Sequence, residues 1–103
     1  GSFYIPMDET LARAVTDISG RPYLSFNAEF SREKVGTFDT ELVEEFFRGL
    51  VINARLTTHI DLLRGGNTHH EIEGIFKAFA RSLKISLSAN DYEGIPSSKG
   101  VIE

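Results

Sequence analysis

The stretch from residue 56 to residue 76, LTTHIDLLRGGNTHHEIEGIF, decides the fold. Its first part, 56–63, is rich in Thr, Ile and Leu, which is typical of a β-strand, and Gly65-Gly66 ends it. Thr68 and Glu71 then match the Ser/Thr-x-x-Glu pattern of a capping box, which predicts a helix that begins at Thr68. Apolar residues follow at helical spacing and predict the buried face of this helix: Ile72, Ile75, Phe76, Phe79, Ala80, Leu83 and Leu87.

A second helix and two further strands are predicted upstream. Asp39 or Thr40 can accept hydrogen bonds from the free N–H groups of a first helical turn. The apolar residues of this helix also recur at helical spacing: Leu42, Val43, Phe46, Phe47, Leu50, Val51 and Ala54. Earlier in the chain, 11–18 and 23–30 alternate apolar and polar side chains around the turn-forming sequence SGRP, so we predict a β-hairpin there.

The remaining segments are predicted to be short or irregular. Pro6-Met7-Asp8-Glu9 is interpreted as a short helical turn, and residues 88–103, with two glycines and one proline, as a loop. The resulting order, β-β-α-β-α, predicts an α+β two-layer sandwich with both helices on one face of a sheet. Gly1-Ser2 is interpreted as a remnant of tag removal.

Composition narrows the classes of function. The chain has 103 residues and a formal net charge of −4, which suits one compact domain and argues against a nucleic-acid partner, because binding phosphates needs a basic face. It has no cysteine, so disulfides and thiolate metal ligands are excluded. No apolar run approaches the roughly 20 residues that cross a bilayer, and no secretory signal is evident. We therefore expect a cytoplasmic protein without a membrane partner.

The start of the second predicted helix gathers residues that bind metal ions. On a helix, His69 and Glu73 project about 40° apart, and His70 and Glu73 about 60° apart. Lys77 projects in a direction between those of His70 and Glu73. His69 and His70 project roughly 100° apart, so they could serve two ions, or one ion each with ligands from another chain. Mixed imidazole and carboxylate ligands suit Mn, Fe or Zn. The alternative is that both histidines are simply solvated.

Several longer motifs extend this pattern. NTHHEIEGIFKAFAR (67–81) closely resembles the second metal-binding helix of the imidazoleglycerol-phosphate dehydratase family. The resemblance continues, in order, through SGRPYL (19–24), FDTELVEEFF (38–47), THI (58–60) and PSSKG (96–100). It covers essentially the whole chain but only the C-terminal half of the family's chain. The resemblance therefore predicts that residues 3–103 are a single half-domain of the ribosomal protein S5 domain 2-like fold.

The resemblance implies a reaction and a cofactor. The family dehydrates imidazole glycerol phosphate to imidazole acetol phosphate in histidine biosynthesis. It uses two manganese ions that hold the substrate's ring as an imidazolate, in sites shared between similar halves and neighbouring subunits of a large symmetric shell. This chain would accordingly be half of a manganese-dependent hydro-lyase, although other divalent metals could replace manganese.

The resemblance also assigns residues. The implied metal ligands are His69, His70, Glu73 and, at a position where the family often has His, Glu45. Glu73 would also lie next to the proton transfer and is the implied catalytic residue. The implied substrate and phosphate ligands are Arg21, Lys77, Ser97, Lys99 and Asp8. His59 is interpreted as structural. Without the resemblance, Glu45 would be interpreted as a solvated glutamate, Arg21 as a turn arginine, Lys77 as a helix-surface lysine, and Ser97 and Lys99 as part of a mobile tail.

Two hypotheses follow from a half without its partner. The first half of the family carries its own His-His-x-x-Glu helix, a further phosphate-binding arginine and a further carboxylate, and none of these is found here. A half that pairs with itself, or with the missing N-terminal half, would keep a metal site, with weak or no dehydratase activity when alone. The alternative is a folded, non-catalytic half-domain, structural or oligomerising, without bound metal.

Overall fold

The computed structural model describes the backbone of residues 1–93 and the side chains of residues 1–88. Four strands form one sheet in the order β1-β2-β6-β3. They are β1 (Ser2–Met7), β2 (Thr10–Asp17), β3 (Tyr23–Asn27) and β6 (Thr57–Arg64). β2 is antiparallel to both β1 and β6, whereas β3 runs parallel to β6.

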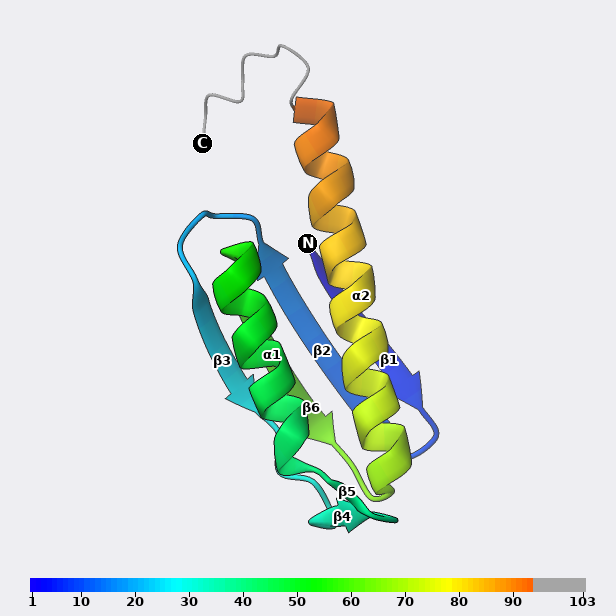
Figure 1. Ribbon diagram of the computed structural model, residues 1–103. Helices are drawn as coiled ribbons and strands as arrows, with labels where there is room; N and C mark the ends of the chain where they lie inside the picture. The colour runs from blue at the N-terminus through cyan, green and yellow to red at the C-terminus, as the bar shows by residue number, and fades with distance from the viewer. Residues whose placement is uncertain (94–103) are drawn as a thin grey trace.

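Two helices cover one face of this sheet (Figure 1). They are α1 (Glu41–Ala54) and α2 (Thr68–Glu93). A small separate hairpin, β4 (Lys34–Val35) and β5 (Phe38–Asp39), lies at the end of the molecule where both helices begin. The α+β two-layer fold with both helices on one face is thus confirmed. No helix among the described residues is long and apolar enough to cross a membrane.

The predicted hairpin between 11–18 and 23–30 is wrong. β2 and β3 are not neighbours, because β6 lies between them and pairs with both. The connection between them passes the start of β6, where the Gly20 N–H donates to the Arg55 carbonyl and the Tyr23 N–H to the Leu56 carbonyl, both at 3.0 Å. Alternation of side chains identifies a strand but not its partner, which non-local contacts decide.

The hairpin of this fold lies earlier, between β1 and β2. These strands are joined by the two-residue turn Asp8-Glu9, and Asp8 has a φ of 53°, a left-handed conformation that Asp tolerates better than most residues. Residues 6–9, predicted as a short helical turn, are therefore the end of a strand and a tight turn. Ser2 is the first residue of β1 and pairs with Val15. The interpretation of the first two residues as a tag remnant stays a prediction.

The core lies between the sheet and the helices. Phe47 of α1 is fully buried, with its ring centroid 4.8 Å from that of Phe76 and 5.2 Å from that of Phe79. Ala12 and Ala14 of β2 are also fully buried, and their small side chains let α2 lie close to the sheet. Burying a side chain the size of Phe47 contributes about 2–3 kcal/mol.

Buried polar groups join α2 to β2 further along the helix. Thr16 Oγ1 and Ser82 Oγ are 2.8 Å apart, and Ser82 Oγ donates to the Phe79 carbonyl at 2.9 Å, so Thr16 is the donor to Ser82. Ser86 Oγ donates to the Thr16 carbonyl at 2.6 Å. Each such bond contributes about 1 kcal/mol net. These hydroxyl groups find their partners inside the chain.

The helices differ from the predicted ones in two respects. α2 continues to Glu93, so residues 88–93, predicted as loop, are helical; this segment contains neither Gly nor Pro to end the helix. In both helices the predicted apolar stripe is wider than the buried one. Leu42 and Phe46 of α1 are 48% and 51% exposed, whereas Val43 and Phe47 are buried. In α2, Leu87, predicted on the buried face, is 49% exposed.

Candidate metal centre

Asn67, and not the predicted capping box, caps the first turn of α2. Asn67 Oδ1 accepts a hydrogen bond from the His70 N–H at 3.0 Å, and the Asn67 carbonyl accepts one from the Glu71 N–H at 2.9 Å. Thr68 begins the helix, as predicted, but its hydroxyl group has no partner among the described residues. The capping box is therefore wrong. Asn caps at least as well as Thr, and here it comes one residue earlier.

Glu71, predicted to complete that box, instead holds the turn between β6 and α2 in place. Its side chain is fully buried, and its carboxylate accepts hydrogen bonds from the Ser31 N–H at 2.9 Å, the Ser31 hydroxyl at 2.5 Å and the Gly66 N–H at 2.7 Å. A Cβ atom at Gly65 would collide with this carboxylate, so the β6–α2 turn needs a glycine there. Glu71 thus ties the segment after β3 to the turn that sets the direction of His69 and His70.

His70 faces the turn between β1 and β2. Its Nδ1 lies 3.2 Å from both carboxylate oxygens of Glu9. One donor atom each from Asp8, Glu9 and His70 lie within 4.8 Å of one another. Thr10 Oγ1 donates to Glu9 at 2.5 Å, and this hydrogen bond, with a smaller one from His70, lowers the pKa of Glu9 below its ordinary value. The result is an ionised carboxylate beside an imidazole.

His69 faces a different carboxylate. Its Nε2 lies 3.4 Å from one oxygen of Glu73, and Lys77 Nζ lies 3.0 Å from the other. The hydrogen bond and the positive charge of Lys77 lower the pKa of Glu73. The His69 side chain is 74% exposed and the Glu73 side chain 37%, so both can reach a ligand outside the chain.

The two imidazoles therefore diverge. Their ring centroids are 6.3 Å apart, and each ring lies next to its own carboxylate, His70 beside Glu9 and His69 beside Glu73. Such an arrangement can serve two separate ions or ligands, and it does not direct both rings at one point. His69, His70 and Glu73 thus lie near one another in the first two turns of α2, as predicted, with the two rings directed apart.

Glu9 is the residue that sequence analysis missed, and Glu45 is the one that lies apart. The group of donor atoms around His70 contains Glu9 and Asp8 but not Glu45, which is exposed on α1. Glu9 is brought to His70 from 61 residues away. Recognising Asp8-Glu9 as the turn between two antiparallel strands could have directed attention to it.

The predicted phosphate ligands are not assembled within one chain. Arg21 lies in the connection between β2 and β3, and its carbonyl accepts a hydrogen bond from Thr57 at the beginning of β6. Lys77 lies on α2, which covers β1 and β2, whereas β3 forms the opposite edge of the sheet. Figure 1 shows α2 over one side of the sheet and β3 at the other. Ser97 and Lys99 lie outside the described residues.

Comparisons with known proteins identify the family of this arrangement. The family model described as imidazoleglycerol-phosphate dehydratase matches residues 1–83. The imidazoleglycerol-phosphate dehydratase of Staphylococcus carnosus is 88% identical over all 103 residues, which are 53% of that protein, and that of Staphylococcus saprophyticus is 82% identical, with 54% covered. The chain therefore spans about half the length of the curated relatives it matches.

Solved structures agree with the sequences. The crystal structure of imidazoleglycerol-phosphate dehydratase from Staphylococcus aureus matches 84% of this chain with a TM-score of 0.83 and 82% identity, over 50% of that chain. The enzyme from Pyrococcus furiosus, solved in complex with (S)-C348, matches 81% of this chain with a TM-score of 0.73 and 36% identity, over 47% of that chain. Sequence and fold together place this chain in the imidazoleglycerol-phosphate dehydratase family.

Proposed function

We propose that this chain is one half of a manganese-dependent dehydratase, and that it binds metal through the first turn of α2. The observation that carries the proposal is the pairing of two adjacent imidazoles with two separate carboxylates, His70 with Glu9 and His69 with Glu73. The two imidazoles lie at one end of α2, and neither has a hydrogen-bond partner in the core of the described chain. The substrate is imidazole glycerol phosphate, and the reaction belongs to histidine biosynthesis in the cytoplasm.

The donor set fits a divalent cation. Ligands of one ion bind at about 2 Å, so their donor atoms are separated by roughly 3–4 Å; those of Asp8, Glu9 and His70 all lie within 4.8 Å of one another. Imidazole nitrogen and carboxylate oxygen are donors that manganese, iron and zinc accept. Three donors leave positions open for the substrate or for residues of another chain, and Glu45 is one candidate to act in that way.

Dehydration requires a proton to leave one carbon and a hydroxyl group to leave the next, so that an enol forms and converts to the ketone. A bound metal ion would act as a Lewis acid and stabilise negative charge on the substrate. Lys77 keeps the Glu73 carboxylate ionised, which suits it for holding or moving a proton next to that ion. The side chain of Lys77 is exposed and can also approach a phosphate group.

The phosphate ligands support pairing between chains. Arg21 precedes β3 at one edge of the sheet and Lys77 lies on α2 over the opposite edge, so we infer that one chain does not clamp a phosphate monoester with both. An Arg21 contributed by a second copy, or by the missing N-terminal half, would complete the clamp. A nucleic-acid partner is not proposed, given the net charge of −4.

The outer surface of the helices supports the same conclusion. A groove of about 340 Å³ between α1 and α2 is lined by apolar side chains, among them Phe46 and Leu87, which are 51% and 49% exposed. Contiguous apolar patches of this kind mark protein–protein contacts. Self-association through a two-fold interface is the simplest arrangement that would cover it.

A second candidate function is that of a folded, non-catalytic module without metal. The separation of Arg21 from Lys77 within one chain is what such a module would also show. Such a module would serve assembly alone.

The deciding experiment measures mass in solution and metal content per chain, before and after manganese is added. We expect a defined oligomer with about one to two ions per chain, and loss of metal in His70→Ala. His59→Ala is the matched control, because His59 is an exposed imidazole on β6, near the Tyr23 ring, and lies outside the donor group. A metal-free monomer that ignores manganese would contradict the proposal and favour the module.

A further inference from the structure

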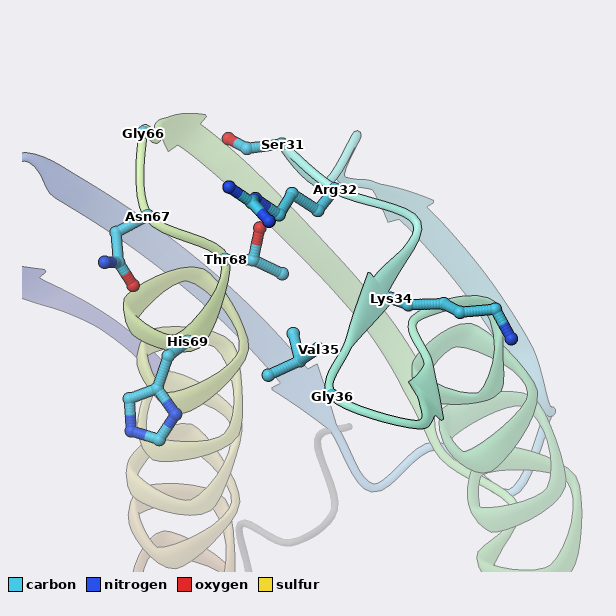
Figure 2. Close-up of a pocket in the computed structure, with 9 residues that line it drawn as sticks. All are labelled: Ser31, Arg32, Lys34, Val35, Gly36, Gly66, Asn67, Thr68 and His69. Carbon is cyan, nitrogen blue, oxygen red and sulfur yellow. The ribbon is translucent and has the colours of Figure 1, made fainter.

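A pocket opens beside the start of α2. It has a volume of about 560 Å³ and lies between the segment 31–36 and residues 66–69 (Figure 2). This volume falls within the range of about 300–1,000 Å³ that is common for small-molecule sites. His69 is the only residue it shares with the donor sets described above.

Two cationic side chains line this pocket. Arg32 extends toward the start of α2, whereas the Lys34 side chain extends from β4 to the far side of this segment. Neither forms an ion pair with a residue of the described part. Glu71 also lies nearby, but its carboxylate is buried and holds three hydrogen bonds of its own. The charged side chains that line the pocket itself are both positive.

The opposite wall is the N-terminus of α2, a helix of 26 residues. The first N–H groups of a helix have no acceptor within it and carry partial positive charge. Asn67 serves the N–H of His70, whereas those of Thr68 and His69 meet no acceptor among residues 1–93. Thr68 and His69 both line the pocket.

The Thr68 hydroxyl supplies an independent observation. Thr68 is 7% exposed, and its Oγ1 is buried without a hydrogen-bond partner in the described chain. In Figure 2 this oxygen points from α2 to the side of the pocket where Arg32 lies. A buried hydroxyl without a partner costs about 1–3 kcal/mol, and such a group usually marks a missing ligand.

We propose that this pocket binds a small molecule through an oxyanion, a phosphate or a carboxylate group. The Thr68 hydroxyl and the N–H groups of Thr68 and His69 donate to it from the helix, while Arg32 approaches it from the opposite wall and Lys34 adds positive charge nearby. Helix N-termini with nearby cations are ready-made anion sites. This site shares no residue with Arg21, Lys77, Ser97 and Lys99, and it does not depend on metal.

The test is a titration of the full chain with sodium phosphate at constant ionic strength, in the presence of a chelator, followed by ¹H–¹⁵N NMR. We expect saturable shifts of the amide signals of Gly66 to His69. Arg32→Gln with Lys34→Gln should weaken binding about 10-fold, since charge-assisted hydrogen bonds are lost. Thr68→Val, with helix content checked by circular dichroism, should weaken it several-fold. A parallel titration with acetate tells a phosphate site from a carboxylate site.

The matched control is Arg48→Gln with Lys84→Gln, which removes the same charge from exposed helix positions outside the pocket. It should leave phosphate binding unchanged. Shifts that do not saturate, or equal weakening in both double variants, would mean non-specific attraction and would overturn the proposal. Because the chelator removes metal, either result is independent of the proposed dehydratase function.

Discussion

The beginning and the later part of α2 use polar side chains in opposite ways. At Ser82 and Ser86 the hydroxyl groups are buried and bonded to Thr16 and to the helix backbone. At the first turn, His69, His70 and Glu73 lie at the surface, each next to a charged or ionisable group, with donor and acceptor capacity left over. The first set is complete without any ligand, whereas the second set is not.

This difference separates polar residues that serve the fold from those that keep hydrogen-bonding or ligating capacity free for a ligand. Position near the site is not the criterion. Glu71 lies in the first turn of α2 yet belongs to the fold, because its carboxylate is fully buried and all of its observed partners are within the chain. The criterion is whether the group finds its partners inside the chain.

The largest expected effect is on the free energy of unfolding, when Glu71 is replaced. Glu71→Leu removes three hydrogen bonds and leaves the Ser31 and Gly66 N–H groups without their acceptor, each at about 1–3 kcal/mol. We expect the free energy of unfolding in urea to fall by about 3 kcal/mol or more. Ser82→Ala, at the later part of the helix, should lower it by only about 1 kcal/mol. Equal losses in the two variants would show that Glu71 does not hold the turn.

A smaller effect is expected at Glu9, the carboxylate that lies next to His70 at the surface. Glu9→Gln removes a negative charge beside His70 while keeping its size, and should weaken manganese binding about 10-fold, or about 1.4 kcal/mol. The free energy of unfolding without metal should change little, because the side chain is partly exposed. Isothermal titration calorimetry measures the affinity, with Glu29→Gln, an exposed carboxylate on another segment, as control. Unchanged affinity would remove Glu9 from the site.

The smallest expected effect concerns the charge of Glu73. Its folded-state pKa is lowered, first by the hydrogen bond from Lys77, so its contribution to stability is present above its ordinary pKa of 4.5 and is lost as pH falls through the lower folded value. Lys77→Met should raise the pKa of Glu73 towards 4.5. A ¹³C NMR titration of the Glu73 carboxyl group between about pH 2 and 7 measures this. Lys84→Met should leave it unchanged, and an unshifted Glu73 in Lys77→Met would contradict the ion pair.

Local patterns predicted the parts of this fold that local interactions decide. The strand 56–63, the glycines that end it and the helix start at Thr68 were all correct, since propensity and turn chemistry act within a few residues. Asp39, one of two predicted caps of α1, accepts the Glu41 N–H at 3.1 Å. The predicted capping box at Thr68 was wrong because Asn67, one residue earlier, also fits a cap and takes that role.

Long-range pairing was beyond the same reasoning. The strands on either side of SGRP alternate as a hairpin would, but β6, more than 30 residues downstream, inserts between them. The contact of Glu9 with His70 depends on that same sheet, so it could not be predicted before the strand order was known. The resemblance to a family supplied His69, His70 and Glu73, but the motif quoted for them does not contain Glu9.

The contact between Glu9 and His70 also has a consequence for chain entropy. These residues are 61 positions apart, and bringing the ends of such a loop together in an unfolded chain costs roughly 4 kcal/mol, by (3/2)RT ln n. The folded sheet has already closed this loop, so any ion that bridges Glu9 and His70 binds without that cost, whereas the unfolded chain meets it in full. Such an ion acts as a removable cross-link between the β1–β2 hairpin and α2, and its removal should first lower the stability of the fold.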